Sequence, residues 1–167
     1  MRVGRTLRVS VVVTALSVLT LTSNTSAANY PTVQVKFGQV VRYKVGIAVA
    51  VIKVTNPATS IDPTLLAPKP GFKFVTVHLL FRNQSSSIYR PFLPGNLYLR
   101  SSSGMTYGPD TSGIGVRDCR DAESSYSVVV LQHVLTRACV IFQMPKRTVL
   151  SAVIFAPPNS SPVLWRH

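Results

Sequence analysis

One stretch, GFKFVTVHLLFRN over Gly71–Asn83, constrains the fold of this chain more than any other. Side chains of a β-strand point alternately to opposite faces, and the odd positions from Val75 to Phe81 are all large and apolar. The even positions are mixed and include His78 and Arg82. One fully apolar face is typical of an inner strand in a two-layer β-protein, whereas a helix would need a 3.6-residue period.

Shorter runs of the same kind recur along the rest of the chain, separated by proline-rich and serine-rich turn signals. Hydrophobic residues make up 46% of the 167 residues and charged residues only 14%, which excludes a typical disordered protein. The other predicted strands are 33–37, 47–55 (ended by Asn56-Pro57), 97–99, 105–107, 126–131, 138–144, 149–155 and an edge strand at 163–165. We predict an all-β, immunoglobulin-like sandwich of two antiparallel sheets with about eight or nine strands.

The first 28 residues have the order of a secretory signal peptide: arginines, then an apolar run over Val9–Thr22, then small residues. An uncleaved anchor is the alternative, but a membrane span needs about 20 apolar residues. No cysteine lies near the cleavage position, which excludes a lipoprotein anchor. We expect cleavage after Ala27 or Ala28, export to the extracellular space without a membrane span, and one mature domain over 29–167.

The chain is strongly basic, with a formal charge of +13. Removing Arg2, Arg5 and Arg8 with the signal peptide leaves 15 basic and 5 acidic residues, a net charge of +10. Such a charge favours anionic partners such as nucleic acid, anionic lipid or cell-wall polymers. Because the basic residues are scattered and form no run, solubility or a general compositional bias also explains them.

Cys119 and Cys139 are the only two cysteines, an even number in a chain that is expected to leave the cytosol. We predict a disulfide between them, with two free buried thiols as the alternative. A metal site would need more ligands, and His133 is the only histidine between the two cysteines.

Three predicted loops, 57–70, 84–96 and 108–125, offer surfaces for a partner. The first is long for a connection in a compact domain, and its two leucines could instead cap the core. The aromatic residues of the second could serve as packing anchors. The candidate interaction residues are Leu65, Leu66, Tyr89, Arg90 and Phe92.

A catalytic site finds little support in the sequence, since no GxSxG, HExxH or P-loop pattern occurs. His78 is expected to pack or hydrogen-bond across strands, and His133 to be exposed. Acidic residues crowd 118–123, DCRDAE, where calcium binding is conceivable, but interleaved arginines favour local ion pairs. We therefore expect no catalytic residue, no metal and no cofactor.

Several short pieces, in this order, resemble the immunoprotective extracellular protein type, a telokin-like immunoglobulin-fold domain. The pieces are 49–54 before an Asn-Pro turn, 71–77 closing at Asn83, 97–99 with Gly104 and Tyr107, 139–145, and 163–165. One departure is the stretch 135–138, LTRA, where similar proteins often place a glycine turn. The resemblance implies a domain exported by actinobacteria and other Gram-positive bacteria, without known catalytic residues.

The sequence thus predicts a secreted, disulfide-bonded, non-catalytic binding module with an extracellular or envelope partner. The first alternative is electrostatic binding of an anionic envelope polymer or nucleic acid, which salt should weaken steeply. The second alternative is an extracellular hydrolase, which would require His78 or His133 in a cleft with a Ser, Asp or Glu partner.

Overall fold

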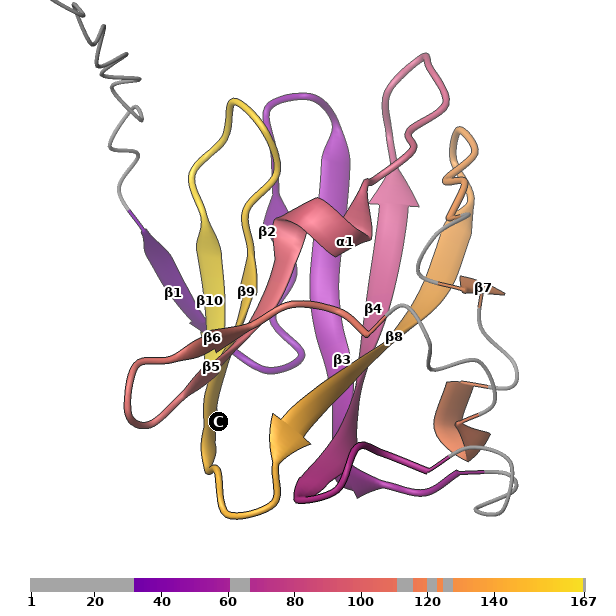
Figure 1. The fold of residues 1–167 in the computed structure, drawn as a ribbon. Coiled ribbons are helices and arrows are strands. Elements are labelled where there is room, and N and C mark those ends of the chain that lie inside the picture. The colour runs from indigo at the N-terminus through magenta and orange to yellow at the C-terminus, as the bar shows by residue number, and fades with distance from the viewer. Residues whose placement is uncertain (1–31, 61–66, 111–115, 120–122, 125–127, 167) are drawn as a thin grey trace, which may run out of the picture.

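The computed structural model describes residues 32–60, 67–110, 116–119, 123–124 and 128–166, in which ten strands form two five-stranded sheets (Figure 1). The first, called the β4 sheet, contains in spatial order β2 (Val41–Arg42), β3 (Ile47–Ala58), β4 (Phe72–Asn83), β8 (Leu135–Pro145) and β7 (Glu123–Ser124). The second, called the β10 sheet, contains β1 (Val33–Lys36), β10 (Val163–Arg166), β9 (Leu150–Phe155), β5 (Leu97–Ser101) and β6 (Thr106–Tyr107). The predicted all-β, immunoglobulin-like two-sheet sandwich is confirmed.

The strand predicted at Gly71–Asn83 is β4, which lies at the centre of its sheet between β3 and β8. Its odd positions from Val75 to Phe81 are fully buried against the β10 sheet, as the alternation predicts. Burial of each such side chain contributes about 1.5–3 kcal/mol before the entropy cost of folding.

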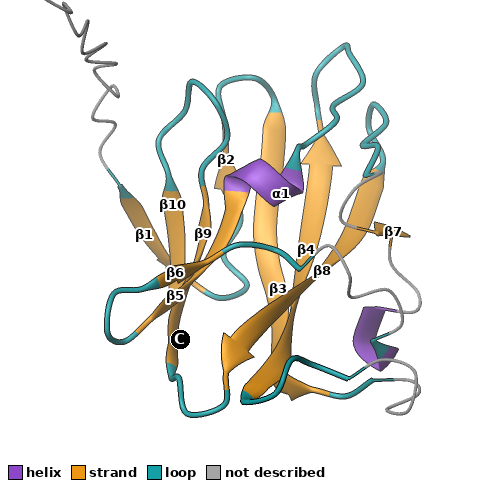
Figure 2. Cartoon of the chain, in the orientation of Figure 1, coloured by secondary structure: helices purple, strands orange, loops and turns teal. Residues whose placement is uncertain are grey.

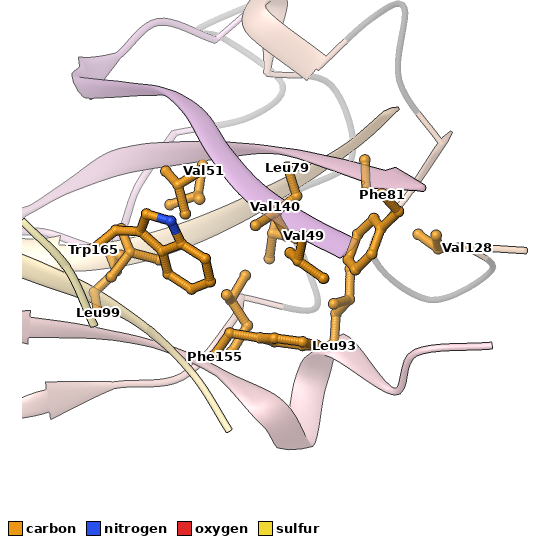
Figure 3. Packing of buried hydrophobic residues seen from close by; sticks show 14 of the residues in the cluster. Val49, Val51, Leu79, Phe81, Leu93, Leu99, Val128, Val140, Phe155 and Trp165 are labelled. Atoms are coloured by element: carbon orange, nitrogen blue, oxygen red, sulfur yellow. The ribbon is translucent and has the colours of Figure 1, made fainter. Parts of the chain in front are cut away.

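The core between the sheets is aromatic as well as aliphatic (Figure 3). Trp165 of β10 is fully buried, and its indole Nε1 donates a hydrogen bond of 3.0 Å to the carbonyl oxygen of Gln39. Phe81 of β4 meets Phe155 of β9 edge to face, with ring centroids 6.1 Å apart. The two sheets are therefore joined by large side chains that come from both of them.

Several details differ from the sequence predictions. The pairs β1–β10 and β7–β8 are parallel, so the sheets are antiparallel except at these two edges. Because β1 pairs with β10, the C-terminal strand is an inner strand and not the predicted edge. Strand β3 continues past Asn56-Pro57 to Ala58, since an irregularity in the register after Thr55 accommodates the proline.

The strand predicted at 126–131 is also wrong for its described part, which makes only isolated bridges. Val130 exchanges backbone hydrogen bonds with the loop residue Tyr89, and not with a strand of either sheet. The next strand, β8, begins at Leu135, and His133 with φ of 59° occupies the turn before it. Two short helices, α1 (Leu93–Asn96) and η1 (Arg117–Cys119), were not predicted because each spans a single turn.

Candidate functional site

Three connections meet at one end of the sandwich, drawn at the top in Figure 2. They are 43–46 between β2 and β3, 84–92 between β4 and α1, and 156–162 between β9 and β10. Loops at the ends of a sandwich are free to carry binding residues because the sheets alone hold the core together.

A cleft opens between these connections, with a hollow of about 200 Å³. We call this hollow the end cleft; its lining residues are Tyr43, Val45, Ile47, Tyr89, Pro157, Pro158 and Ser160. A second hollow of about 360 Å³ adjoins it and shares Tyr43, Val45 and Ser160. A mostly apolar cleft with a few polar groups is the usual form of a binding site.

Tyr43 lines both hollows. Its ring meets Phe155 edge to face, with centroids 6.0 Å apart. Its hydroxyl oxygen is buried and has no hydrogen-bond partner among the described residues. Burial raises the pKa of the Tyr43 phenol, and the nearby Tyr89 raises it further, so the hydroxyl ionises only at a higher pH than an ordinary tyrosine.

Asn83, the last residue of β4, organises the loop that follows it. Its fully buried amide nitrogen donates to the carbonyl oxygens of Ser87 at 2.7 Å and Val130 at 3.0 Å. Its Oδ1 accepts from the backbone nitrogen of Ser85 at 2.9 Å and from the Ser85 hydroxyl at 2.7 Å. The loop is thus fixed by a hydrogen-bond network in which the amide of Asn83 is fully used.

The β2–β3 connection is fastened to the same loop through Gly46. The backbone nitrogen of Gln84 donates to the Gly46 carbonyl at 2.7 Å. A Cβ at position 46 would lie 3.0 Å from the backbone nitrogen of Ser85, and the φ of 81° also favours glycine. This hydrogen bond therefore ties two of the three connections around the end cleft to each other.

Large apolar side chains stand exposed on the connections at this end of the sandwich. Phe92 is 65% exposed, Ile88 52% and Val45 63%. The Phe92 ring lies on Gly95 of α1, where a Cβ would come within 2.7 Å of two ring atoms. This contact with the helix backbone restricts the ring on one side and leaves the rest of it exposed, which lowers the entropy cost of using it for binding.

The structure places the predicted interaction residues in different environments. Tyr89 is half-buried, packs against Phe81 with centroids 6.4 Å apart and lines the end cleft. Arg90 and Phe92 are exposed. Leu65 and Leu66 lie outside the described residues. Tyr43 and the Pro157-Pro158 pair were not predicted as interaction residues. Their position between short strands is a signal that could have placed them in a loop at the end of the sandwich.

The predicted disulfide between Cys119 and Cys139 is confirmed, and it fastens η1 to β8. His78 lies beside it, with Nε2 3.7 Å from the Sγ of Cys139. The ion pair of Lys53 and Asp118, 3.6 Å between Nζ and Oδ1, is close by. Burial lowers the pKa of His78, Lys53 lowers it further, and Asp118 acts in the opposite direction.

The described residues contain no hydrogen bond from His78 to a Ser, Asp or Glu side chain, and His133 is exposed on a turn. In the same ranges, no group of three or more His, Cys, Asp or Glu side chains is placed to hold a metal ion. Among the described contacts, His78 instead makes a cross-strand contact with the disulfide. None of the helices described is long and apolar enough to cross a membrane.

Comparison with solved structures finds β-sandwiches at very low sequence identity. The secreted protein MPT63 of Mycobacterium tuberculosis has a TM-score of 0.56 at 13% identity, over 84% of this chain and 100% of that one. An uncharacterized β-sandwich protein of Clostridium difficile 630 has a TM-score of 0.53 at 8% identity, over 82% and 95% of the two chains. A conserved hypothetical protein of Bacillus anthracis has a TM-score of 0.53 at 15% identity, over 78% and 94%. These similarities extend over almost the whole of each neighbour and establish the fold.

No protein-family model matches the chain, and the search of curated proteins found no relative.

Proposed function

We propose that this protein is an exported, non-catalytic binding module that recognises a partner through the end cleft and the apolar side chains beside it. The observation that carries the proposal is the combination of an apolar cleft with the exposed ring of Phe92, which packs on Gly95 at the same end of the sandwich. An exposed aromatic side chain that is already ordered loses little entropy when a partner covers it, and aromatic anchors dominate binding energies at interfaces.

Export is supported by two observations. The N-terminal 28 residues follow the order of a signal peptide, and a solved structure of similar fold belongs to a secreted protein. We further propose that the chain is of the immunoprotective extracellular protein type, because the strand pieces that carry this resemblance fall on β3, β4, β5, β8 and β10. A binding role without catalysis agrees with histidines whose described hydrogen bonds include no acidic or serine side chain.

A capture experiment tests the proposal. Mature protein, residues 29–167, is immobilised and exposed to culture supernatant and envelope fractions at low and high salt. Phe92→Ser is compared with Met105→Ser, because Met105 is also exposed, at 62%, but lies on the turn between β5 and β6. We expect a partner that survives high salt and is lost with Phe92→Ser alone. Recovery of no partner at either salt concentration, or equal loss with both variants, would overturn the proposal.

A further inference from the structure

The outer face of the β4 sheet is covered over one half and open over the other. Over the covered half, η1 packs on β3, β4 and β8, and Val116 bridges Ser60. The outward residues Phe74 and Thr76 of β4 are buried beneath such segments. Over the other half, a groove of about 190 Å³ is lined by Val40, Arg42, Ala48, Ala50, Leu80, Arg82, Gln84 and Leu135. We call this hollow the outer groove.

Small side chains form the floor of the outer groove. Ala48 and Ala50 point outward from β3, because Val49 and its neighbours at odd positions face the core. Leu80 of β4 lies directly across from Ala50 in the register. Larger residues at the two alanine positions would fill the space, so the groove exists because these outward positions are small.

Guanidinium groups flank this floor. Arg42 and Arg82 each pair with Ala48, from β2 and from β4, in one row across the sheet. Their Cα atoms are therefore two strand spacings apart, about 10 Å. In the neighbouring row, the exposed Arg137 of β8 lies across from Leu80. Three positive charges thus surround an apolar strip.

No acidic side chain neutralises these arginines within the described part of the chain. The ion pair found there is that of Lys53 and Asp118, on the covered half of the sheet. Asp110 also lies on that half, where its carboxylate accepts a hydrogen bond from Gln143 of β8. Among the described side chains, the positive charge of the outer groove is therefore uncompensated, and it attracts an anion.

We propose that the outer groove binds a linear phosphodiester polymer whose repeating units are polyols or sugars and carry no bases. Arginine guanidinium groups bind phosphate oxygens through paired, charge-assisted hydrogen bonds, and an apolar floor suits the carbon chain between successive phosphates. Single-stranded nucleic acid is bound differently, through aromatic side chains on which the bases stack, and the outer groove has no aromatic lining. The outer groove shares no lining residue with the end cleft, although Arg42 also lines the hollow that adjoins it. The proposal does not depend on the proposed function above.

The test is binding of mature protein to a poly(glycerol phosphate) of defined length, measured by calorimetry between 50 and 200 mM salt. Arg42→Gln/Arg82→Gln is compared with Arg100→Gln/Arg166→Gln, which removes the same charge from exposed arginines of the β10 sheet. We expect the first pair to weaken binding at least tenfold at low salt. The slope of the logarithm of the binding constant against the logarithm of the salt concentration should become shallower by about 1.4, which is about 0.7 for each of the two lost phosphate contacts. The second pair should change the affinity by less than about threefold.

Ala50→Leu supplies a variant of unchanged charge, and it should also weaken binding because the added side chain fills the floor of the outer groove. Melting curves of all variants verify that they are folded. An oligothymidylate with the same number of phosphates is measured in parallel and should bind more weakly. Equal losses in the two arginine pairs, unchanged binding of Ala50→Leu, or tighter binding of the oligothymidylate would each overturn the proposal.

Discussion

The buried hydroxyl of Tyr43 leads to an unusual prediction, that its removal stabilises the protein. A buried polar group without a partner loses its hydration on folding, which costs about 1–3 kcal/mol. The Tyr43 hydroxyl is such a group among the described residues. After allowance for the small void that remains, we expect Tyr43→Phe to raise the free energy of unfolding by about 1 kcal/mol.

Tyr98 offers a matched control, because its hydroxyl does have a partner. It donates a hydrogen bond of 2.5 Å to the carbonyl oxygen of Gly95. Tyr98→Phe removes the same atom but breaks this bond, which should lower the free energy of unfolding by about 1 kcal/mol. The two variants should therefore move the stability in opposite directions and differ by about 2 kcal/mol.

Urea unfolding of mature protein measures the difference. With a slope of about 2 kcal/mol per molar, each change shifts the midpoint by about 0.5 M, in opposite directions. The gain from Tyr43→Phe should widen above about pH 10. The raised pKa of the Tyr43 phenol means that the unfolded chain ionises first, so the wild type loses stability as the pH rises through that range. If Tyr43→Phe destabilises as much as Tyr98→Phe, the hydroxyl is satisfied and the reasoning is wrong.

Three further perturbations test other contacts that hold the sheets and loops together. Replacing both cysteines by alanine removes a cross-link between residues 20 positions apart. In the chain-entropy model this should lower the free energy of unfolding, measured in urea, by about 3 kcal/mol. An unchanged midpoint would contradict the role of the disulfide. Asn83→Leu leaves the carbonyls of Ser87 and Val130 without their donor and should cost about 3 kcal/mol, with faster proteolysis of the 84–89 loop; a loss below about 0.5 kcal/mol would refute the network. The lowered pKa of His78 means that the unfolded chain takes up the proton first, so the wild type should lose stability as the pH falls below about 6.5. His78→Gln should reduce this loss. Parallel pH profiles of the wild type and the variant would contradict this reasoning.

The central strand could be predicted from the sequence because its information is local. The four apolar odd positions between Val75 and Phe81 require one buried face, whatever their neighbours are. The disulfide could be predicted for a similar reason, since Cys119 had only one possible partner. Both predictions follow from residues that leave few alternatives.

The features that the sequence analysis missed or predicted wrongly depend on pairing between distant segments. Strand β1 joins β10 from the opposite end of the chain, and no local pattern in Val163–Arg166 distinguishes an inner strand from an edge. The end cleft likewise combines Tyr43, Tyr89 and Pro157 from three connections. Of its aromatic residues only Tyr89 was predicted, because the residues near Tyr43 alternate too weakly to show which side chains meet at the end of the sandwich.

Site-specific photo-crosslinking tests the central claim, binding through the end cleft, most directly. A benzophenone side chain is placed at Ile88, which is 52% exposed in the 84–92 connection, or at Met105, which is 62% exposed on the β5–β6 turn. Each mature protein is irradiated in the presence of culture supernatant and envelope fractions. We predict a discrete covalent adduct from position 88 and none from position 105. Adducts of equal yield from both positions, or an adduct from position 105 alone, would contradict recognition through the end cleft.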